Sequence, residues 1–184
     1  TKTVGGFARM KTLIDEKRKE DPGLLLLDGG DFSMGTLYQT INRTEAAELT
    51  MMGRLGYDAV TFGNHEFDYR SNGLSEMLIS AVKNKEEDAS LTLPMLLSAN
   101  IDWEKNKDQE DQKLREAMEL YGAKPYTILE RNGVKIGIYG VLGQEAEDFA
   151  PESGIDFDPI VDTSKKIVKE LKDQGAEMII CLSH

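Results

Sequence analysis

The residues of this sequence best suited to chemistry are its two histidines, His65 and His184, and the polar residues near them. His65 lies in the run Gly63-Asn64-His65-Glu66, where a glycine lets the backbone pass close to a neighbour and an amide and an imidazole follow in succession. Asp31 ends the run Asp28-Gly29-Gly30-Asp31. A carboxylate, an amide oxygen and an imidazole suit a borderline divalent metal such as Mn, Fe or Zn, whereas calcium takes more oxygens. These residues are therefore candidates for a metal site.

Each of these motifs, taken alone, also has a plain structural explanation. A histidine at the end of a strand often serves as a hydrogen-bonded turn residue, and Asp28-Gly29-Gly30-Asp31 fits a glycine turn closed by side-chain hydrogen bonds. Other catalytic motifs fail. His65 has no second histidine four residues later, and Ser33 and Ser183 lack the context of a nucleophile elbow. The glycines at 137, 140 and 143 match neither a dinucleotide fingerprint nor a phosphate loop.

The composition excludes several classes of protein. The chain has 22 Lys and Arg against 33 Asp and Glu, a formal net charge of −11, which is the opposite of the basic surface that binds nucleic-acid phosphates. We therefore expect no nucleic-acid duplex as a partner. The single cysteine, Cys181, can form neither an internal disulfide nor a cysteine-based zinc module. No apolar run approaches the roughly 20 residues of a membrane span, and 184 residues with 40% hydrophobic composition are typical of one globular domain.

Four apolar segments, most of them followed by a turn and a helical pattern, predict alternating strands and helices and therefore an α/β fold. The predicted strands are residues 24–27, 58–62, 94–97 and 178–182. Asn132-Gly133, between residues 126–130 and 134–141, predicts an antiparallel hairpin. In open α/β sheets, ligands bind beyond the carboxyl ends of the strands. The polar residues expected at that edge of the sheet are Asp28, Asp31, Asn64, His65, Asn100 and His184.

Apolar residues at three- and four-residue spacing predict the helices. The first helix is marked by Phe7, Met10, Leu13 and Ile14. Asn42, with Glu45 three positions later, is typical of a capping box. The charge-rich stretch from Trp103 to Arg115 is predicted to be a solvated insertion or the exposed face of a helix.

In combination, the motifs resemble those of a known superfamily. Gly30-Asp31 with Gly35, then Gly63-Asn64-His65-Glu66, then an apolar strand ending in Ser183-His184 are similar to the second, third and fourth motifs of the calcineurin-like metallophosphoesterases. Within that superfamily, the chain most resembles the 5′-nucleotidase and 2′,3′-cyclic-nucleotide phosphodiesterase family. Phe67-Asp68, directly after the third motif, supports this resemblance, which covers essentially the whole chain.

The resemblance implies a role for each candidate residue. Asp31 matches the carboxylate that bridges two metal ions, and Asn64 and His184 match ligands of the second ion. His65 matches the catalytic histidine, which binds no metal, and Asp68 matches the acid that orients it. A carboxylate three residues further on can hold one ring nitrogen, so that the other faces the leaving oxygen.

The resemblance also implies a four-layer α-β-β-α metallophosphoesterase-like sandwich and metal-dependent hydrolysis of nucleotide phosphoesters. The reaction is expected to be of the 5′-nucleotidase or cyclic-nucleotide phosphodiesterase type. The expected cofactors of the intact protein are two divalent metal ions (Mn, Zn, Fe or Mg), which offset the acidic charge that would repel a nucleotide. The expected substrate is a small nucleotide or another phosphoester, and no substrate-binding residue is assigned. Relatives in the family are commonly exported or held at the cell surface.

Two motifs of the family are missing from the sequence. The first, Asp-x-His, belongs on a strand before the first helix, and the last, Gly-His-x-His, follows the fourth motif. We therefore expect residues 1–184 to be a partial metallophosphoesterase domain of a longer protein, an incomplete sandwich without the C-terminal nucleotide-recognition domain. With only Asp31, Asn64 and His184 as ligands, this chain is expected to hold at most one weakly bound metal. It is expected to show little or no phosphatase activity by itself.

An alternative reading belongs to another class of protein. In a non-catalytic α/β module, Asp31, Asn64 and His184 would cap strands and bind a small polar ligand. The two readings differ in metal dependence, because only a metal site predicts that Mn²⁺ stabilises the chain and that His184→Ala abolishes the effect. A third reading, a surface-interaction protein that uses the region of Trp103, has little in its favour.

Overall fold

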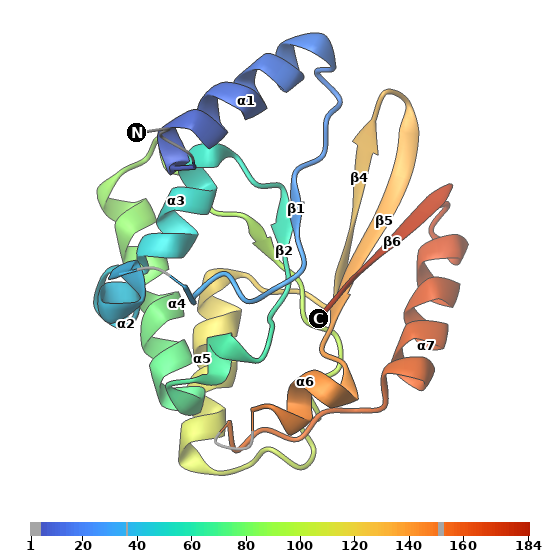
Figure 1. Cartoon of the computed structure of the whole chain (residues 1–184). Helices are drawn as coiled ribbons and strands as arrows, with labels where there is room; N and C mark the ends of the chain where they lie inside the picture. Colours follow the sequence, from blue (N-terminus) through green and yellow to red (C-terminus); the bar gives the residue numbers. More distant parts are fainter. Residues whose placement is uncertain (1–4, 36, 151–152) are drawn as a thin grey trace.

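The computed structural model describes residues 5–35, 37–150 and 153–184, and in these ranges helices flank two small β-sheets (Figure 1). The helices are α1 (Phe7–Glu20), α2 (Asn42–Glu45), α3 (Ala47–Leu55), α4 (Arg70–Glu87), α5 (Gln109–Tyr121), α6 (Gln144–Asp148) and α7 (Ile160–Asp173). Two short 3-10 segments are η1 (Leu37–Ile41) and η2 (His65–Phe67). The strands are β1 (Leu27–Asp28), β2 (Ala59–Val60), β3 (Met95–Leu96), β4 (Tyr126–Arg131), β5 (Val134–Val141) and β6 (Met178–Ser183). Within the described ranges, no helix is long and apolar enough to cross a membrane.

Each sheet has three strands. β1, β2 and β3 are parallel, with Leu27 opposite Ala59, whereas β4 and β5 are antiparallel and β6 runs parallel to β5. The α/β class predicted from the sequence is confirmed. The first three predicted strands are shortened to two residues each. The last predicted strand, β6, pairs with β5 and not with the parallel sheet, so the polar edge expected from one sheet is assembled from two.

Asp58 explains why β1 begins later than predicted. Its carboxylate accepts the backbone N–H of Leu26 at 2.8 Å, in the place where a strand partner would otherwise be. The same carboxylate pairs with the guanidinium of Arg131 on β4, again at 2.8 Å. Regular pairing therefore starts at Leu27, and one side chain connects the two sheets at the end opposite to the polar edge.

The predicted hairpin is confirmed, with Arg131 opposite Val134 at its closed end. The two turn residues, Asn132 and Gly133, have φ angles of 52° and 79°. Positive φ at both positions is typical of a type I′ turn, and asparagine and glycine adopt it at low cost. The Asn-Gly turn therefore agrees with the register of β4 and β5.

Three apolar clusters hold these elements together. The first joins the parallel sheet to α3, α4 and α5, the second lies between the two sheets, and the third joins β5 and β6 to α7 (Figure 1). Representative residues, in that order, are Leu74, Met77 and Leu78, then Ala59, Leu97 and Ile138, then Tyr139, Val141 and Leu171. Burial of each large apolar side chain stabilises the fold by about 1.5–3 kcal/mol. A Cβ atom at Gly140 would lie 2.1 Å from the carbonyl oxygen of Leu97, so glycine permits the sheets to approach there.

Two local predictions are corrected by the structure. Helix α1 forms, but of its predicted apolar face only Ile14 is buried, and Leu13 is 56% exposed. Asn42 does not cap a helix. Its side chain is buried and donates a hydrogen bond to the sulfur of Met77, because a tertiary contact competes for the amide.

The charge-rich stretch from Trp103 to Arg115 is partly helical, as one of its two readings predicted. Asp108 caps α5, and with Asp111 it forms a capping box. Trp103 packs against the first apolar cluster, and the guanidinium of Arg115 lies 5.8 Å from its ring centroid. The tryptophan is therefore a part of the packing between the loop and α5.

Candidate metal centre

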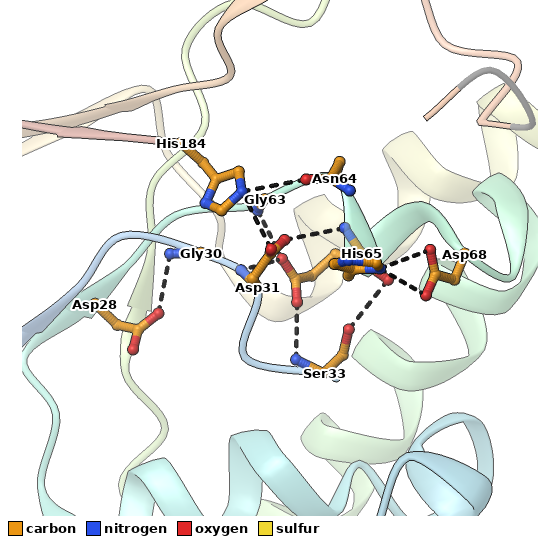
Figure 2. Close-up of polar contacts among 10 residues, drawn as sticks. Asp28, Gly30, Asp31, Ser33, Gly63, Asn64, His65, Asp68 and His184 are labelled. Atoms are coloured by element: carbon orange, nitrogen blue, oxygen red, sulfur yellow. Dashed lines mark hydrogen bonds and ion pairs between the residues drawn. The ribbon is translucent and has the colours of Figure 1, made fainter. Parts of the chain in front are cut away.

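The three ligands predicted from the sequence meet at the polar edge, one from each of three loops or strand ends (Figure 2). Asp31 follows β1, Asn64 follows β2, and His184 follows β6 in the other sheet. The Nε2 atom of His184 lies 3.1 Å from Oδ2 of Asp31 and 3.1 Å from Oδ1 of Asn64. The structure therefore brings a carboxylate, an amide oxygen and an imidazole around one point, although they belong to different sheets.

Close approach of two backbones positions Asp31 beside Asn64. Gly30 has a φ of +108°, and a Cβ there would lie 2.5 Å from the backbone nitrogen of Gly63. A Cβ at Gly63 would lie 2.2 Å from Oδ1 of Asp31. Asp31 itself has a φ of +61°, a conformation that residues other than glycine rarely adopt. The two glycines are needed because no side chain fits between the loops.

His184 is held at the cluster through its backbone. Its carbonyl oxygen accepts the N–H of Gly143, at the start of α6, at 2.9 Å. The side chains of His184 and Asp31 are 31% and 29% exposed, so solvent reaches the cluster. A surface hollow adjoins it, lined by Asn64, His184 and residues of α6, together with Phe149 and Ile160. A cation or a small anion therefore has access to these side chains.

The second predicted pair, His65 and Asp68, is also in contact (Figure 2). Nδ1 of His65 lies 2.9 Å and 3.1 Å from the two carboxylate oxygens of Asp68. This hydrogen bond raises the pKa of His65 above its usual value, and partial burial opposes the rise to a smaller extent. With Nδ1 engaged, Nε2 is the ring nitrogen available for a substrate or a proton. The tautomer of His65 is inferred from this hydrogen-bond partner.

Glu66 adjoins the cluster, and sequence reasoning assigned no role to it. Its buried carboxylate accepts three backbone N–H groups, those of Asp31 and Gly63 on Oε2 and that of Ser33 on Oε1, at 2.8, 2.6 and 2.9 Å. Burial raises the pKa of Glu66, and the three N–H donors counteract part of that rise. Its position as the last residue of Gly63-Asn64-His65-Glu66 was the one available signal. The residue connects the loop after β1 to the loop after β2.

Two residues expected at the polar edge lie outside the cluster. Asp28 accepts the N–H of Gly30 at 3.0 Å, and burial raises its pKa. Asn100 is fully buried, where its amide bonds the backbone of Leu142 and the carbonyl of Asp158. Both residues therefore shape the loops that surround the site.

The donors of the cluster fit a divalent cation by their chemistry. Carboxylate, amide and imidazole groups together suit a borderline metal. Over the part of the chain that the structure describes, no three residues drawn from His, Cys, Asp and Glu gather as a metal-binding group. The cluster supplies two such residues, Asp31 and His184, and its third donor is the amide of Asn64. The set therefore fits one metal ion through three protein ligands.

The fold is similar to solved structures of nucleotidases. The structure of a 5′-nucleotidase precursor from Thermus thermophilus matches with a TM-score of 0.75 and 29% identity, over 98% of this chain and 32% of that one. The NAD nucleotidase of Haemophilus influenzae matches with a TM-score of 0.70 and 28% identity, over 98% of this chain and 28% of the other. The chain therefore has the α/β fold of a segment of these enzymes.

Curated sequences give the same result. The 5′-nucleotidase of Rattus norvegicus is 36% identical over 186 residues, and that of Bos taurus is 34% identical over 186 residues. These matches cover 98% and 100% of this chain but only 28% and 29% of the relatives. No protein-family model matches the sequence. The chain is a segment of the 5′-nucleotidase family, and it spans less than a third of the length of these relatives.

Proposed function

We propose that this segment provides part of the metal centre of an enzyme that hydrolyses nucleotide phosphoesters, of the 5′-nucleotidase or cyclic-nucleotide phosphodiesterase type. The observation that supports the proposal best is the convergence of Asp31, Asn64 and His184 beside the His65 and Asp68 pair. Membership of a family of metal-dependent phosphoesterases supports the same reaction class. In this proposal, residues 1–184 are a part of a four-layer metallophosphoesterase sandwich.

In the intact protein, Asp31, Asn64 and His184 would hold the divalent cations together with residues from outside this segment. Divalent cations bound there supply positive charge to the oxygens of the phosphoryl group. That charge is needed because the chain has a net charge of −11 and would otherwise repel an anionic nucleotide.

His65 delivers a proton to the leaving oxygen of the substrate. The Asp68 carboxylate holds Nδ1 at 2.9 Å, which sets the orientation of the ring and favours its protonated form. A protonated imidazole can donate from Nε2 to an alkoxide leaving group, whose departure would otherwise be slow. Asp68 thus acts through His65 and does not need to contact the substrate.

Three ligands are too few for a bridged pair of ions, so the 184-residue chain holds at most one metal ion, weakly. The chain alone accordingly turns over nucleotides slowly or not at all. Brisk release of phosphate from a nucleotide by this chain with Mn²⁺ would contradict that expectation.

The two histidines provide a matched test of metal binding in the 184-residue chain. Mn²⁺ is expected to raise the melting temperature of the wild type, because a ligand that binds only the folded state stabilises it by about 2.7 kcal/mol at 100 times its Kd. His184→Ala is expected to abolish the increase, and His65→Ala is expected to retain it. No stabilisation of the wild type by Mn²⁺ would favour the non-catalytic binding module.

The reaction itself is tested in a protein of the length of the relatives that contains this segment. His65→Ala is expected to leave bound metal unchanged and to lower kcat by about 10²- to 10⁴-fold, the usual contribution of a general acid. Asn64→Ala is expected to lower metal content first. If neither change alters turnover of a nucleotide, the assignment of these residues is wrong.

A further inference from the structure

The buried carboxylate of Glu66, in the loop after β2, bonds the backbone of both this loop and the loop after β1. Its oxygens accept N–H groups from residues 33 and 35 positions earlier in the chain as well as from Gly63, three positions earlier. Glu66 is only 4% exposed, and its carboxylate accepts three backbone N–H groups. Both carboxylate oxygens of Glu66 are therefore engaged by the backbone of the two loops, and the residue is placed to control the geometry of these loops.

We propose that Glu66 is a positioning residue of the metal centre, which orients the carboxylate of Asp31 toward His184 and Asn64 by fixing the backbone on which Asp31 stands. This inference rests on the proposed function only for the statement that Asp31 binds a metal. The geometric part, from Glu66 to the arrangement of the three side chains, is independent of it.

The backbone of Asp31 is held in an unusual conformation beside Glu66. Its φ of +61° is unfavourable for a residue with a side chain and persists only where neighbouring groups impose it. The N–H of Asp31 donates to Oε2 of Glu66 at 2.8 Å, and Gly63, which shares that oxygen, lies against Asp31. Loss of these acceptors leaves Asp31 free to return to an ordinary φ, which would turn its carboxylate away from His184.

The two carboxylate oxygens of Asp31 have different partners. Oδ1 accepts the N–H of His65 at 3.1 Å, which leaves Oδ2 to face Nε2 of His184. The N–H of His65 is in place because Ser33, itself bound by Glu66, donates its hydroxyl to the carbonyl of His65 at 3.1 Å. Glu66 thus holds the backbone N–H of Asp31 directly, and it acts on Oδ1 of Asp31 through Ser33 and His65.

The hydrogen bonds at Glu66 require a carboxylate. Three N–H donors converge on two oxygens, and an ionised carboxylate offers acceptors only. A glutamine at this position would present an NH₂ group to at least one of these donors. Because the side chain of Glu66 is buried, water cannot replace the lost acceptor. Glu66→Gln therefore alters the loops with almost no change in side-chain volume.

The test compares Glu66→Gln and Glu66→Asp with Asp111→Asn, each in the 184-residue chain. Asp111 is a suitable control because it is also a carboxylate with 4% exposure, but it lies on α5 in a capping box. Metal-free NMR is the first measurement. In the wild type, couplings across hydrogen bonds are expected between the Glu66 carboxyl carbon and the amide nitrogens of Asp31, Ser33 and Gly63. In Glu66→Gln, the side-chain signals of Asn64 and His184 are expected to shift, although Glu66 touches neither side chain.

Mn²⁺ affinity, measured by the decrease of the free-ion EPR signal, is the second measurement. Glu66→Gln is expected to weaken binding at least about tenfold, and Glu66→Asp, which keeps the charge, is expected to bind more tightly than Glu66→Gln. Asp111→Asn is expected to lower the melting temperature while affinity stays within about twofold of the wild type.

The outcomes separate this proposal from the proposed function. The proposal is overturned if wild-type couplings to the Asp31 amide are absent, if a folded Glu66→Gln keeps the Asn64 and His184 signals of the wild type, or if Asp111→Asn shifts them equally. Should Glu66→Gln fail to fold, Glu66→Asp is judged by the same signals. If the signals respond as expected but the wild type binds no Mn²⁺, the proposed function fails and the positioning role of Glu66 stands.

Discussion

Replacement of Gly30 by alanine tests whether the candidate site depends on the contact between two backbones. The new Cβ would lie 2.5 Å from the nitrogen of Gly63 and 2.7 Å from the carbonyl carbon of Phe62, both backbone atoms. The φ of +108° adds strain of about 1–3 kcal/mol for a residue with a side chain. Overpacking costs about 1–3 kcal/mol more. The expected loss of unfolding free energy is therefore about 2–6 kcal/mol, a large share of the stability of a typical domain.

Gly35→Ala is the matched control, because Gly35 has a φ of +91° but no atom within 4 Å of its Cβ position. It is expected to carry only the strain, about 1–3 kcal/mol. Urea unfolding followed by circular dichroism gives both free energies, provided that the m-values agree. Equal losses in Gly30→Ala and Gly35→Ala would refute the reasoning, since the loops would then have room to separate at no cost.

Three further predictions concern the surroundings of the site. Asn100→Ala is expected to lower the free energy of unfolding by about 3 kcal/mol in urea, because it leaves the buried N–H of Leu142 without its acceptor and removes two donated bonds. Asp68→Asn is expected to lower the pKa of His65, measured by NMR titration, since the Asp68 hydrogen bond raises it. The raised pKa contributes stability that is complete below the pKa of the unfolded chain and is lost as the pH rises through the folded value. The destabilisation by Asp68→Asn is therefore expected to be greater at pH 5 than at pH 9. Asp108→Ala is expected to cost about 0.5–2 kcal/mol in the same urea assay, through loss of the α5 cap.

Each of these predictions has an outcome that contradicts it. A stable Asn100→Ala would mean that the contact between the loops after β3 and β5 is dispensable. An unchanged pKa of His65 in Asp68→Asn would remove the orienting role of the acid, and a pH-independent difference in stability would have the same effect. For Asp108, the exposed Glu110→Ala is a fitting comparison, and an equal cost in the two variants would show that the cap contributes nothing specific.

The parts of the fold that follow from short-range chemistry were predictable. Asn132-Gly133 specifies a turn by local backbone preference, and the hairpin forms as expected. Alternating apolar segments and helical patterns indicated the α/β class. Asp31, Asn64 and His184 lie together, as their places at strand ends indicated, although their proposed roles remain predictions.

The features that sequence reasoning missed depend on contacts between distant segments. Asn42 fails as a cap because Met77, 35 residues away, takes its amide. Glu66 acquires its partners from a loop that precedes it by more than 30 residues, and no local pattern shows this. The capping box of α5 was missed for a different reason, since Asp111 stands where glutamate or glutamine is usual.

The position of His184 at the end of β6 also decides when the site appears during synthesis. Asn64 lies 120 residues before His184, and Asp31 lies earlier still. Because chains emerge from the ribosome starting at the N-terminus, the loops after β1 and β2 exist well before β6 can pair with β5. In a nascent chain, Asp31 and Asn64 therefore exist without His184, and the three side chains can meet only once β6 has paired with β5.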